Sequence, residues 1–389
     1  MRPATAYGAL AALLVADAAL LHAGTPWWAL LGAVAAAVAA LPRGRAAFLA
    51  GSLVGMAFYG ALLALAVPGE PSWRLGPLRV GADGALRGLQ AALRMAALVG
   101  LNVAAVAWLR PARLLEAVRL PRGATAFLAA VLLAVEDLAR DFRQLRDAKR
   151  LAGGWPRGRL ARAREAASLL APLMVLAHER GEARRDALRL AGLDTGPRFV
   201  PLVAVTALAA AGRLAFVALP NVALTYVVVF LGGLLHGPLV GFTAGVLAMV
   251  LTDLMLSGPL PHVLVNAPAM GLVGLAGAAF GILRARGAAA DGPVDGPTTV
   301  AYAASAGILA TFLFSAAADA GTWLVLPELR GDTAALGALL VAGLAFNALP
   351  ALVNGALFAA AVGPVARAFA ARRARPASSP SVAALPLDP

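Results

Sequence analysis

The sequence predicts an all-α polytopic membrane protein, and three observations lead to this fold class. Of the 389 residues, 61% are hydrophobic and only 14% are charged, whereas about a quarter of the residues in soluble domains are charged. The apolar residues gather in runs close to the length of about 20 residues that a helix needs to cross a bilayer. The net charge of +13 comes mainly from arginines outside these runs, as expected of cytoplasmic loops.

The composition also excludes several classes of enzyme. The chain has no cysteine, which rules out disulfides, thiolate metal sites and cysteine nucleophiles. Its only lysine, Lys149, lies outside any glycine-rich loop, so the phosphate-binding motif of P-loop ATPases is missing. The His-Glu-x-x-His motif of zinc hydrolases is missing as well. We therefore predict a protein that is not an enzyme and that binds no cofactor or metal of its own.

Four apolar runs near the start of the chain predict membrane helices. We expect the first run to be retained rather than cleaved as a signal peptide, because Asp17 interrupts it and a second run follows directly. A polar, Pro/Gly-rich stretch at Pro68–Gly84 separates the third run from the fourth. The four runs are Ala4–Ala23, Trp27–Leu41, Ala46–Val67 and Ala85–Leu109.

Residues 110–198 are rich in arginine, with apolar residues recurring at helical spacing. This pattern predicts amphipathic helices that lie at the membrane surface or dock on a partner. One phrase occurs twice, at Asp147–Gly153 and Asp186–Gly192, and it predicts two helix ends that are each closed by a glycine. The block is either a basic surface that meets lipid headgroups or a docking platform for carboxylates of a cytosolic partner. The candidate docking residues are Arg146, Arg150, Arg185 and Arg189.

Six further apolar runs follow and predict a second membrane domain. They divide the chain into residues 1–198, residues 199–371 and a disordered cytoplasmic tail at 372–389, which is rich in proline and serine. The six predicted spans are Phe199–Leu219, Val222–Leu235, Leu239–Leu256, Val263–Leu283, Thr299–Leu326 and Ala334–Phe369.

Arginine placement orients these spans. Arg198 precedes the first span, Arg284 follows the fourth, and Arg372 follows the sixth. An even number of crossings returns the chain to the same side, so all three lie in the cytoplasm. We expect both termini to lie there too.

Polar and ionisable side chains gather at the outward ends of the six spans. Such groups are costly in a membrane and often functional, and a few polar groups beside an aromatic wall are typical of a small-molecule site. The alternative is that these are loop residues in water and that Asn347 makes a hydrogen bond between helices. The candidate substrate-binding residues are Asn221, Tyr226, Asp253, His262, Asn266, Asp319, Trp323 and Asn347.

Small residues repeat every four positions on the first of the six spans. Close contact between membrane helices favours such a stripe, which consists here of Ala207, Ala211 and Ala215.

The first part of the chain, over residues about 80–192, resembles the transmembrane T component of energy-coupling factor (ECF) transporters. In that family two cytosolic coupling helices end in Ala-Arg-Gly signatures that dock into two ATP-binding-cassette ATPases. Here Ala152 and Ala191 replace the signature arginines. The residues that carry the resemblance are Val80–Gln90, Ala92–Met95, Leu132–Gly153, Ala171–Met174 and Ala187–Gly192.

Residues about 199–369 resemble an S component, the substrate-binding membrane subunit of the same transporters. Six spans with both termini inside is the architecture of that family. The residues that carry this resemblance are Arg213–Phe216, Leu219–Val222, Gly232–Gly233, His236–Pro238, Gly241, Gly245, Asp253 and Gly271–Gly274.

Together the two resemblances imply a fusion of T-like spans and coupling helices with a six-helix S-like bundle. Such a protein would lie in the cytoplasmic membrane of a prokaryote and bind a vitamin or related micronutrient from outside. Its partners would be two ABC-type ATPase subunits, identical or paralogous, that use ATP and Mg²⁺, together with membrane lipid but no nucleic acid. The alanine stripe would be the contact between the T and S parts.

The substrate and two other functions stay open at this point. Cobalamin is the preferred substrate, with a thiamin precursor, riboflavin and a deazapurine as alternatives. A secondary transporter driven by protons or sodium would need an intramembrane carboxylate relay, for which Asp17, Glu136, Asp253 and Asp319 are candidates. A membrane enzyme or assembly factor that uses the basic surface is the third possibility.

Overall fold

A computed structural model describes most of the chain from residue 121 onward. Before that point it describes two strands and scattered helical residues between 12 and 101, so the four predicted spans of this region lie largely outside the described residues. Single residues are also described between 158 and 165. The continuous stretches are 121–154, 168–193, 195–215, 224–256, 262–286, 297–326 and 329–374.

A β-hairpin interrupts the otherwise helical structure. Strands β1 (Ser72–Leu75) and β2 (Leu78–Gly81) pair antiparallel, with Ser72 opposite Gly81. This hairpin is the exception to the all-α prediction among the described residues. The sequence of this stretch contains a hairpin signal. Apolar residues alternate with other residues on both sides of the Gly76-Pro77 pair, with Trp73 and Leu75 before it and Leu78 and Val80 after it.

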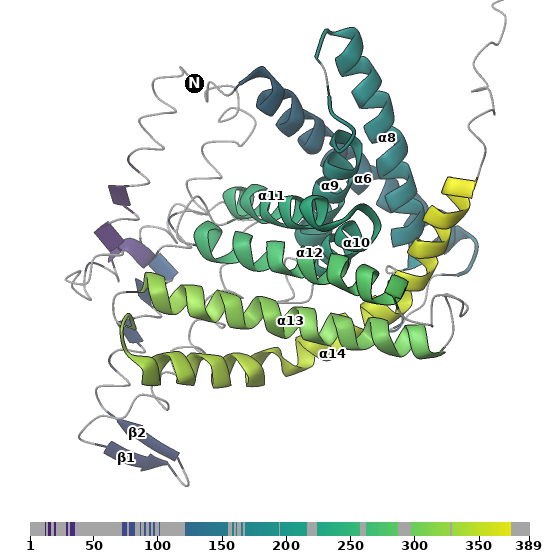
Figure 1. Cartoon of the computed structure of the whole chain (residues 1–389). Coiled ribbons are helices and arrows are strands. Elements are labelled where there is room, and N and C mark those ends of the chain that lie inside the picture. The colour runs from purple at the N-terminus through teal and green to yellow at the C-terminus, as the bar shows by residue number, and fades with distance from the viewer. Residues whose placement is uncertain are drawn as a thin grey trace, which may run out of the picture.

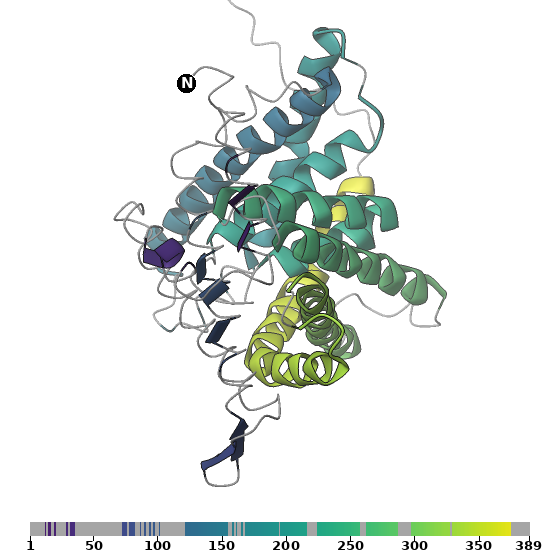
Figure 2. The ribbon, with the colours of Figure 1, turned by 90° about the vertical axis from the view of Figure 1, so that its left-hand side faces the viewer.

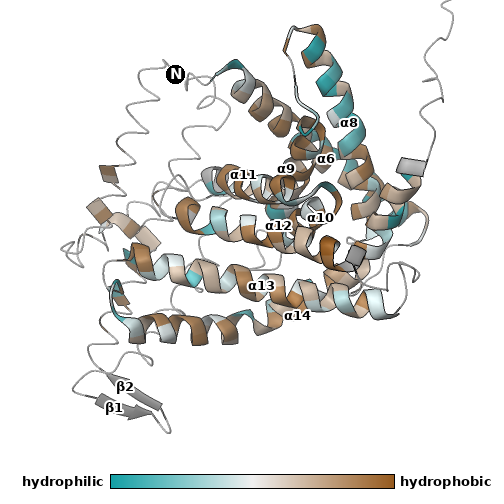
Figure 3. Ribbon diagram, in the orientation of Figure 1, coloured by the Kyte–Doolittle hydropathy of each residue, from teal (hydrophilic) through white to brown (hydrophobic). Residues whose placement is uncertain are grey.

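Two long basic helices follow, α6 (Arg122–Leu151) and α8 (Leu170–Leu190). Figure 1 shows α8 standing out from the other helices, and Figure 3 shows hydrophilic residues along one side of it. Both helices pack against α9 (Phe199–Ala215). They bury apolar faces that include Leu138 and Leu173, as the amphipathic pattern predicts.

The last six helices agree with the six predicted spans to within a few residues. α9 is followed by α10 (Leu224–His236), α11 (Pro238–Leu256), α12 (His262–Arg286), α13 (Pro297–Val325) and α14 (Thr333–Ala374). Among the described residues, three stretches are long and apolar enough to cross a membrane, and α9, α10 and α11 are shorter apolar helices. The three stretches are Val263–Leu283, Thr298–Val325 and Thr333–Arg372.

Glycines let α10, α11 and α12 approach through their backbones. Gly237 between α10 and α11 has φ +88°, a conformation that glycine adopts without strain. A Cβ on Gly241 of α11 would lie 2.6 Å from the Cα of Gly233 and 2.8 Å from the carbonyl oxygen of Gly274. The glycines that carry the resemblance to S components are therefore packing residues at a helix crossing.

One hydrophobic core runs through α6, α8 and α9–α14. Figures 1 and 2 both show α13 and α14 side by side, next to α10–α12. The predicted domain boundary at residue 198 falls just before α9, and buried residues continue across it from Leu173 of α8 to Val203 of α9. The predicted domains therefore share one interior.

Candidate functional site

The two copies of the repeated phrase end α6 and α8 with the same backbone geometry. Gly153 and Gly192 have φ +73° and +78°. The amide of Gly154 donates to the carbonyl of Lys149 at 2.9 Å, and the amide of Leu193 donates to the carbonyl of Leu188 at 2.9 Å. This bond pattern defines a Schellman cap. The predicted pair of glycine-closed helix ends is confirmed.

Each of these helix tips exposes a leucine. Leu151 and Leu190 occupy the same position in the repeat, and each is 91% exposed. Arg150 and Arg189 immediately before them are exposed as well. The two tips therefore present the same apolar group beside the same positive charge.

Three of the four candidate docking arginines form ion pairs with aspartates close to them in the sequence. Arg146 lies 2.9 Å from Asp147, Arg150 lies 3.8 Å from the same carboxylate, and Arg185 lies 3.7 Å from Asp186. Exposed pairs of this kind contribute about 0–1 kcal/mol.

A network of four charged residues ties α6 to α8. Arg180 lies 2.6 Å from Asp141 and 3.1 Å from Asp137, and Arg184 lies 2.5 Å from Asp137. The Asp141 side chain is only 7% exposed, so its charge depends on Arg180 for compensation. The sequence prediction treated these arginines as part of the free basic surface and missed this network.

The basic helix pair is joined to α9 at the start of that helix. The rings of Phe127 in α6 and Phe199 are 6.1 Å apart, edge to face. A Cβ on Gly181 of α8 would lie 3.0 Å from Val200. In the predicted stripe further along α9, Ala207 is fully buried and Ala211 is half-buried, while the Ala215 side chain lies outside the described residues. Their role as a T–S contact stays a prediction.

A second junction joins α8 to α14 and α10. Arg372 near the end of α14 lies 2.8 Å from Glu182 of α8. His178 of α8 stacks on His236 at the end of α10, with ring centroids 4.9 Å apart, and Phe369 of α14 meets His178 edge-on at 5.0 Å. Burial, then the nearby His236 and Arg372, lowers the pKa of His178 from 6.5 to about 3. His178 is therefore neutral at pH 7.

The predicted substrate-binding residues fall in several places. Asn221 and the side chain of His262 lie outside the described residues. Tyr226 of α10 is buried and meets Phe314 of α13 edge-on at 5.3 Å. Asn266 is half-buried on α12.

Asp253 forms a buried ion pair. Its carboxylate, 1% exposed, lies 2.6 Å from Arg213 of α9, and Arg213 also donates to the hydroxyl of Thr252 at 2.6 Å. Asp253 is thus not a loop residue in water, because it lies in α11 and ties this helix to α9.

Asp319 and Asn347 come together between α13 and α14. Asn347 donates to the Ser315 hydroxyl at 2.6 Å and to the Gly343 carbonyl at 2.8 Å, so the helix-to-helix hydrogen bond is confirmed. A Cβ on Gly343 would clash with the Asp319 carboxylate. One oxygen of this carboxylate is buried and accepts no hydrogen bond from the described residues. The result is a buried acceptor packed against the backbone of Gly343.

Trp323 lies one turn beyond Asp319 on α13. Its indole N–H donates to the carbonyl of Asp332 at 2.9 Å, which fixes the ring at the end of the helix. Within the described residues, no group of three or more His, Cys, Asp or Glu side chains could hold a metal ion.

These features define the class of the protein as a polytopic helical membrane protein. In it, two basic helices with matching tips are joined by ion pairs and pack on an apolar helical bundle. Residues 4–201 match the family described as cobalt transport protein (CbiQ), and the chain belongs to this family. It is therefore a membrane component of an ECF-type transporter. The resemblance of the first part to a T component is confirmed. No curated protein and no solved structure matches the chain.

Breaking the charge network should loosen the helix pair. Replacing Asp141 with alanine leaves Arg180 with one carboxylate fewer and should lower the free energy of unfolding by about 1–3 kcal/mol. The thermal midpoint of the purified protein in mild detergent measures this loss. Asp147→Ala, which removes an exposed carboxylate from the same helix, is the matched control, and an equal effect of both changes would contradict the role of the network.

Acidification should weaken the junction at His178. Unfolding returns the pKa of His178 to about 6.5. Between pH 6.5 and about 3 the unfolded chain therefore binds more protons than the folded chain, and stability decreases as the pH is lowered. From pH 7.5 to 5 the loss is about 2 kcal/mol, measured as the thermal midpoint.

The His178→Gln variant should show a smaller dependence on pH, with His236, Arg372 and Glu182 still in place. An unchanged pH profile in this variant would assign the acid sensitivity to other groups.

Proposed function

We propose that this chain is the membrane subunit of an ATP-driven ECF-type importer. In this proposal the bundle of α9–α14 captures a micronutrient from outside, and α6 and α8 transmit ATP hydrolysis by partner ATPases to the bundle. The observation that supports it most is the pair of matching tips, Leu151 and Leu190, each 91% exposed, on two helices that a charge network holds together.

Two tips of the same geometry call for two partner surfaces of the same kind. Two ATPase chains, identical or paralogous, meet this requirement, each taking one leucine into an apolar groove beside carboxylates that pair with Arg150 or Arg189. The Ala-Arg-Gly signature is altered to Leu-Ala-Gly in both copies. In the proposed contact the leucine and the preceding arginine supply the binding surface instead.

The coupling path runs through contacts on two sides of α8. One is its contact with α9 at Gly181 and Val200, and the other is its ion pair with Arg372 of α14. A displacement of α8 by bound ATPases would therefore act on the first and the last helix of the bundle, α9 and α14. In this scheme the tips, Arg372 and both termini face the cytoplasm of a prokaryotic cell.

The proposed substrate is a vitamin-like micronutrient, with cobalamin preferred. The family description, cobalt transport protein, favours a substrate that is or contains cobalt. The proposed binding region is the outward end of α13 and α14, with Asp319, Asn347 and Trp323. In this proposal the other predicted binding residues would complete the site, and these are Asn221, Tyr226, Asp253, His262 and Asn266.

A second candidate function rests on Asp319 alone. A buried carboxylate oxygen without a hydrogen-bond donor among the described residues, inside a candidate span, also suits a proton- or ion-coupled secondary transporter. Uptake of labelled cobalamin and of ⁵⁷Co²⁺ into vesicles, with and without ATP, separates the two functions. Uptake that needs ATP and survives a protonophore supports the importer, whereas protonophore-sensitive uptake without ATP supports the alternative.

The helix tips should be required for ATPase binding. Changing Leu151 and Leu190 to aspartate, or Arg150 and Arg189 to glutamate, should abolish copurification of ATPase subunits from native membranes, because a charge then opposes each groove. Mass spectrometry of the affinity-purified complex measures the subunits. Arg143→Glu reverses an exposed charge on α6 away from the tip, where Arg143 donates to the carbonyl of Ala139 in its own helix, and should leave the complex intact. ATPases retained by the tip variants would refute the docking proposal.

The α13–α14 polar cluster should be required for ligand binding. Asp319→Asn and Trp323→Ala should each weaken binding of the transported micronutrient about tenfold, which corresponds to about 1.4 kcal/mol. Equilibrium binding to the purified protein measures this. Thr322→Val is the matched control, because its hydroxyl donates only within its own helix, to Ala318. Unchanged affinity in both test variants would remove the cluster from the binding site.

A further inference from the structure

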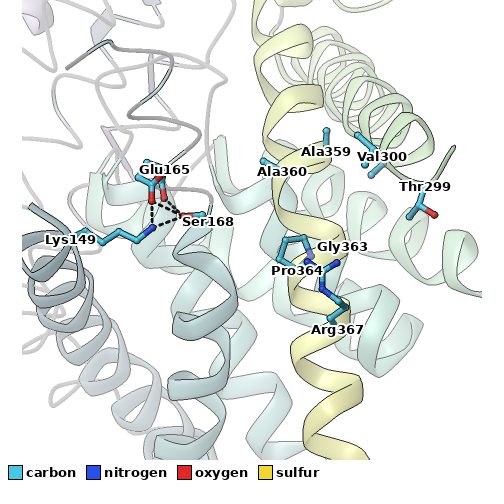
Figure 4. A pocket seen from close by; sticks show the side chains of 11 residues that line it. Lys149, Glu165, Ser168, Thr299, Val300, Ala359, Ala360, Gly363, Pro364 and Arg367 are labelled. Carbon is cyan, nitrogen blue, oxygen red and sulfur yellow. Dashed lines mark hydrogen bonds and ion pairs between the residues drawn. The ribbon is translucent and has the colours of Figure 1, made fainter. Parts of the chain in front are cut away.

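A cavity of about 670 Å³ separates the basic helix pair from the α13–α14 hairpin. Figure 4 shows its two sides, with Lys149, Glu165 and Ser168 facing the first turns of α13 and the end of α14. None of the candidate substrate-binding residues and none of the tip residues lines it. The wall on the hairpin side consists of Thr299, Val300, Ala303, Ala359, Ala360, Gly363, Pro364 and Arg367.

The polar groups of this cavity favour an anion with several acceptor oxygens. Lys149 forms an ion pair with Glu165 and donates to the Ser168 hydroxyl at 3.1 Å, which uses two of its three donors among the described residues. Arg367 supplies a second cation from the opposite side, and Thr299 supplies a hydroxyl. Lys149 and Arg367 therefore offer cationic donors from opposite walls of the cavity, an arrangement that suits the oxygens of a phosphodiester.

The first turn of α13 adds to this preference. The helix begins at Pro297, so the amides of the next residues have no partner within the helix and point toward its start. Thr299 and Val300 of this turn line the cavity. The positive end of the helix therefore lies at the same wall as Thr299.

The cavity lies at the boundary of the membrane-spanning stretches. It is lined by residues at the beginning of the stretch Thr298–Val325 and near the end of the stretch Thr333–Arg372. This is the depth of lipid headgroups, and basic pockets between membrane helices on the cytoplasmic side are sites for anionic headgroups.

An apolar track leads from the cavity along α14. Leu352 is 63% exposed, and Ala356, Ala360, Gly363 and Arg367 follow it at spacings of three or four residues, which places them on one face of the helix. The small side chains leave width beside the helix for an acyl chain. The same face thus runs from an exposed leucine to the basic end of the cavity.

We propose that this cavity binds the phosphate headgroup of an anionic phospholipid, such as phosphatidylglycerol, with the headgroup between Lys149 and Arg367 and an acyl chain along α14. The lipid would join the basic helix pair to the α13–α14 hairpin. This inference does not depend on the transported substrate.

Lipid binding is tested on the full-length protein in detergent, by the gain in thermal midpoint on adding phosphatidylglycerol and by mass spectrometry of retained lipid. We expect phosphatidylglycerol to stabilise the protein and phosphatidylcholine or millimolar inorganic phosphate not to do so. Arg367→Gln should weaken the apparent lipid affinity about fivefold. Ala360→Leu, which fills the cavity without a change of charge, should weaken it as well.

Arg330→Gln is the matched control, because it removes the same charge near the opposite end of the hairpin, where Arg330 donates to the carbonyl of Leu324. An equal loss with Arg330→Gln would show general surface attraction and overturn the proposal. So would equal stabilisation by phosphatidylcholine. Stabilisation by inorganic phosphate alone would show that the cavity takes a free anion rather than a lipid.

Discussion

The ion pairs between Asp137 and Asp141 of α6 and Arg180 and Arg184 of α8 are the constraint on which the rest of the structure depends. Two basic helices repel each other, and a net charge of +13 increases this repulsion. The two carboxylates convert it into attraction at one crossing point. The crossing brings α6 and α8 together, and both helices pack against α9.

The membrane bundle is held together differently from the basic helix pair. Its described polar contacts are few, and they join residues of the bundle to one another. Asn347 bonds Ser315, and Asn354 bonds the Thr311 hydroxyl at 3.0 Å, two contacts along the α13–α14 hairpin. Elsewhere glycines bring backbones together. In lipid, burial of apolar groups gives little driving force between helices, so close packing and a few hydrogen bonds decide which helices pair. The bundle can therefore be specific without being strongly polar.

Much of this architecture could be predicted from the sequence, because lipid composition and glycine caps are local signals. The bounds of α9–α14 and the ends of α6 and α8 at Gly153 and Gly192 belong to this part. Pairings over long sequence separations were out of reach. Nothing in an arginine-rich block distinguishes Arg180, which is bound to Asp141, from Arg189 at an exposed tip. In the same way, the composition of α13 and α14 gave no sign of the cavity beside Lys149, because its walls come from segments about 130 to 220 residues apart.

The length of α14 has a mechanical consequence. Its 42 residues make a rod of about 63 Å, roughly twice the hydrocarbon thickness of a bilayer. Pro350 and Pro364 remove hydrogen bonds at two points and create joints. The segment before the first joint lies against α13, and the segment after the second carries Arg372 to Glu182. A tilt of one segment about a proline would therefore move the far end of α14, and this helix connects the α13–α14 hairpin to the basic helices.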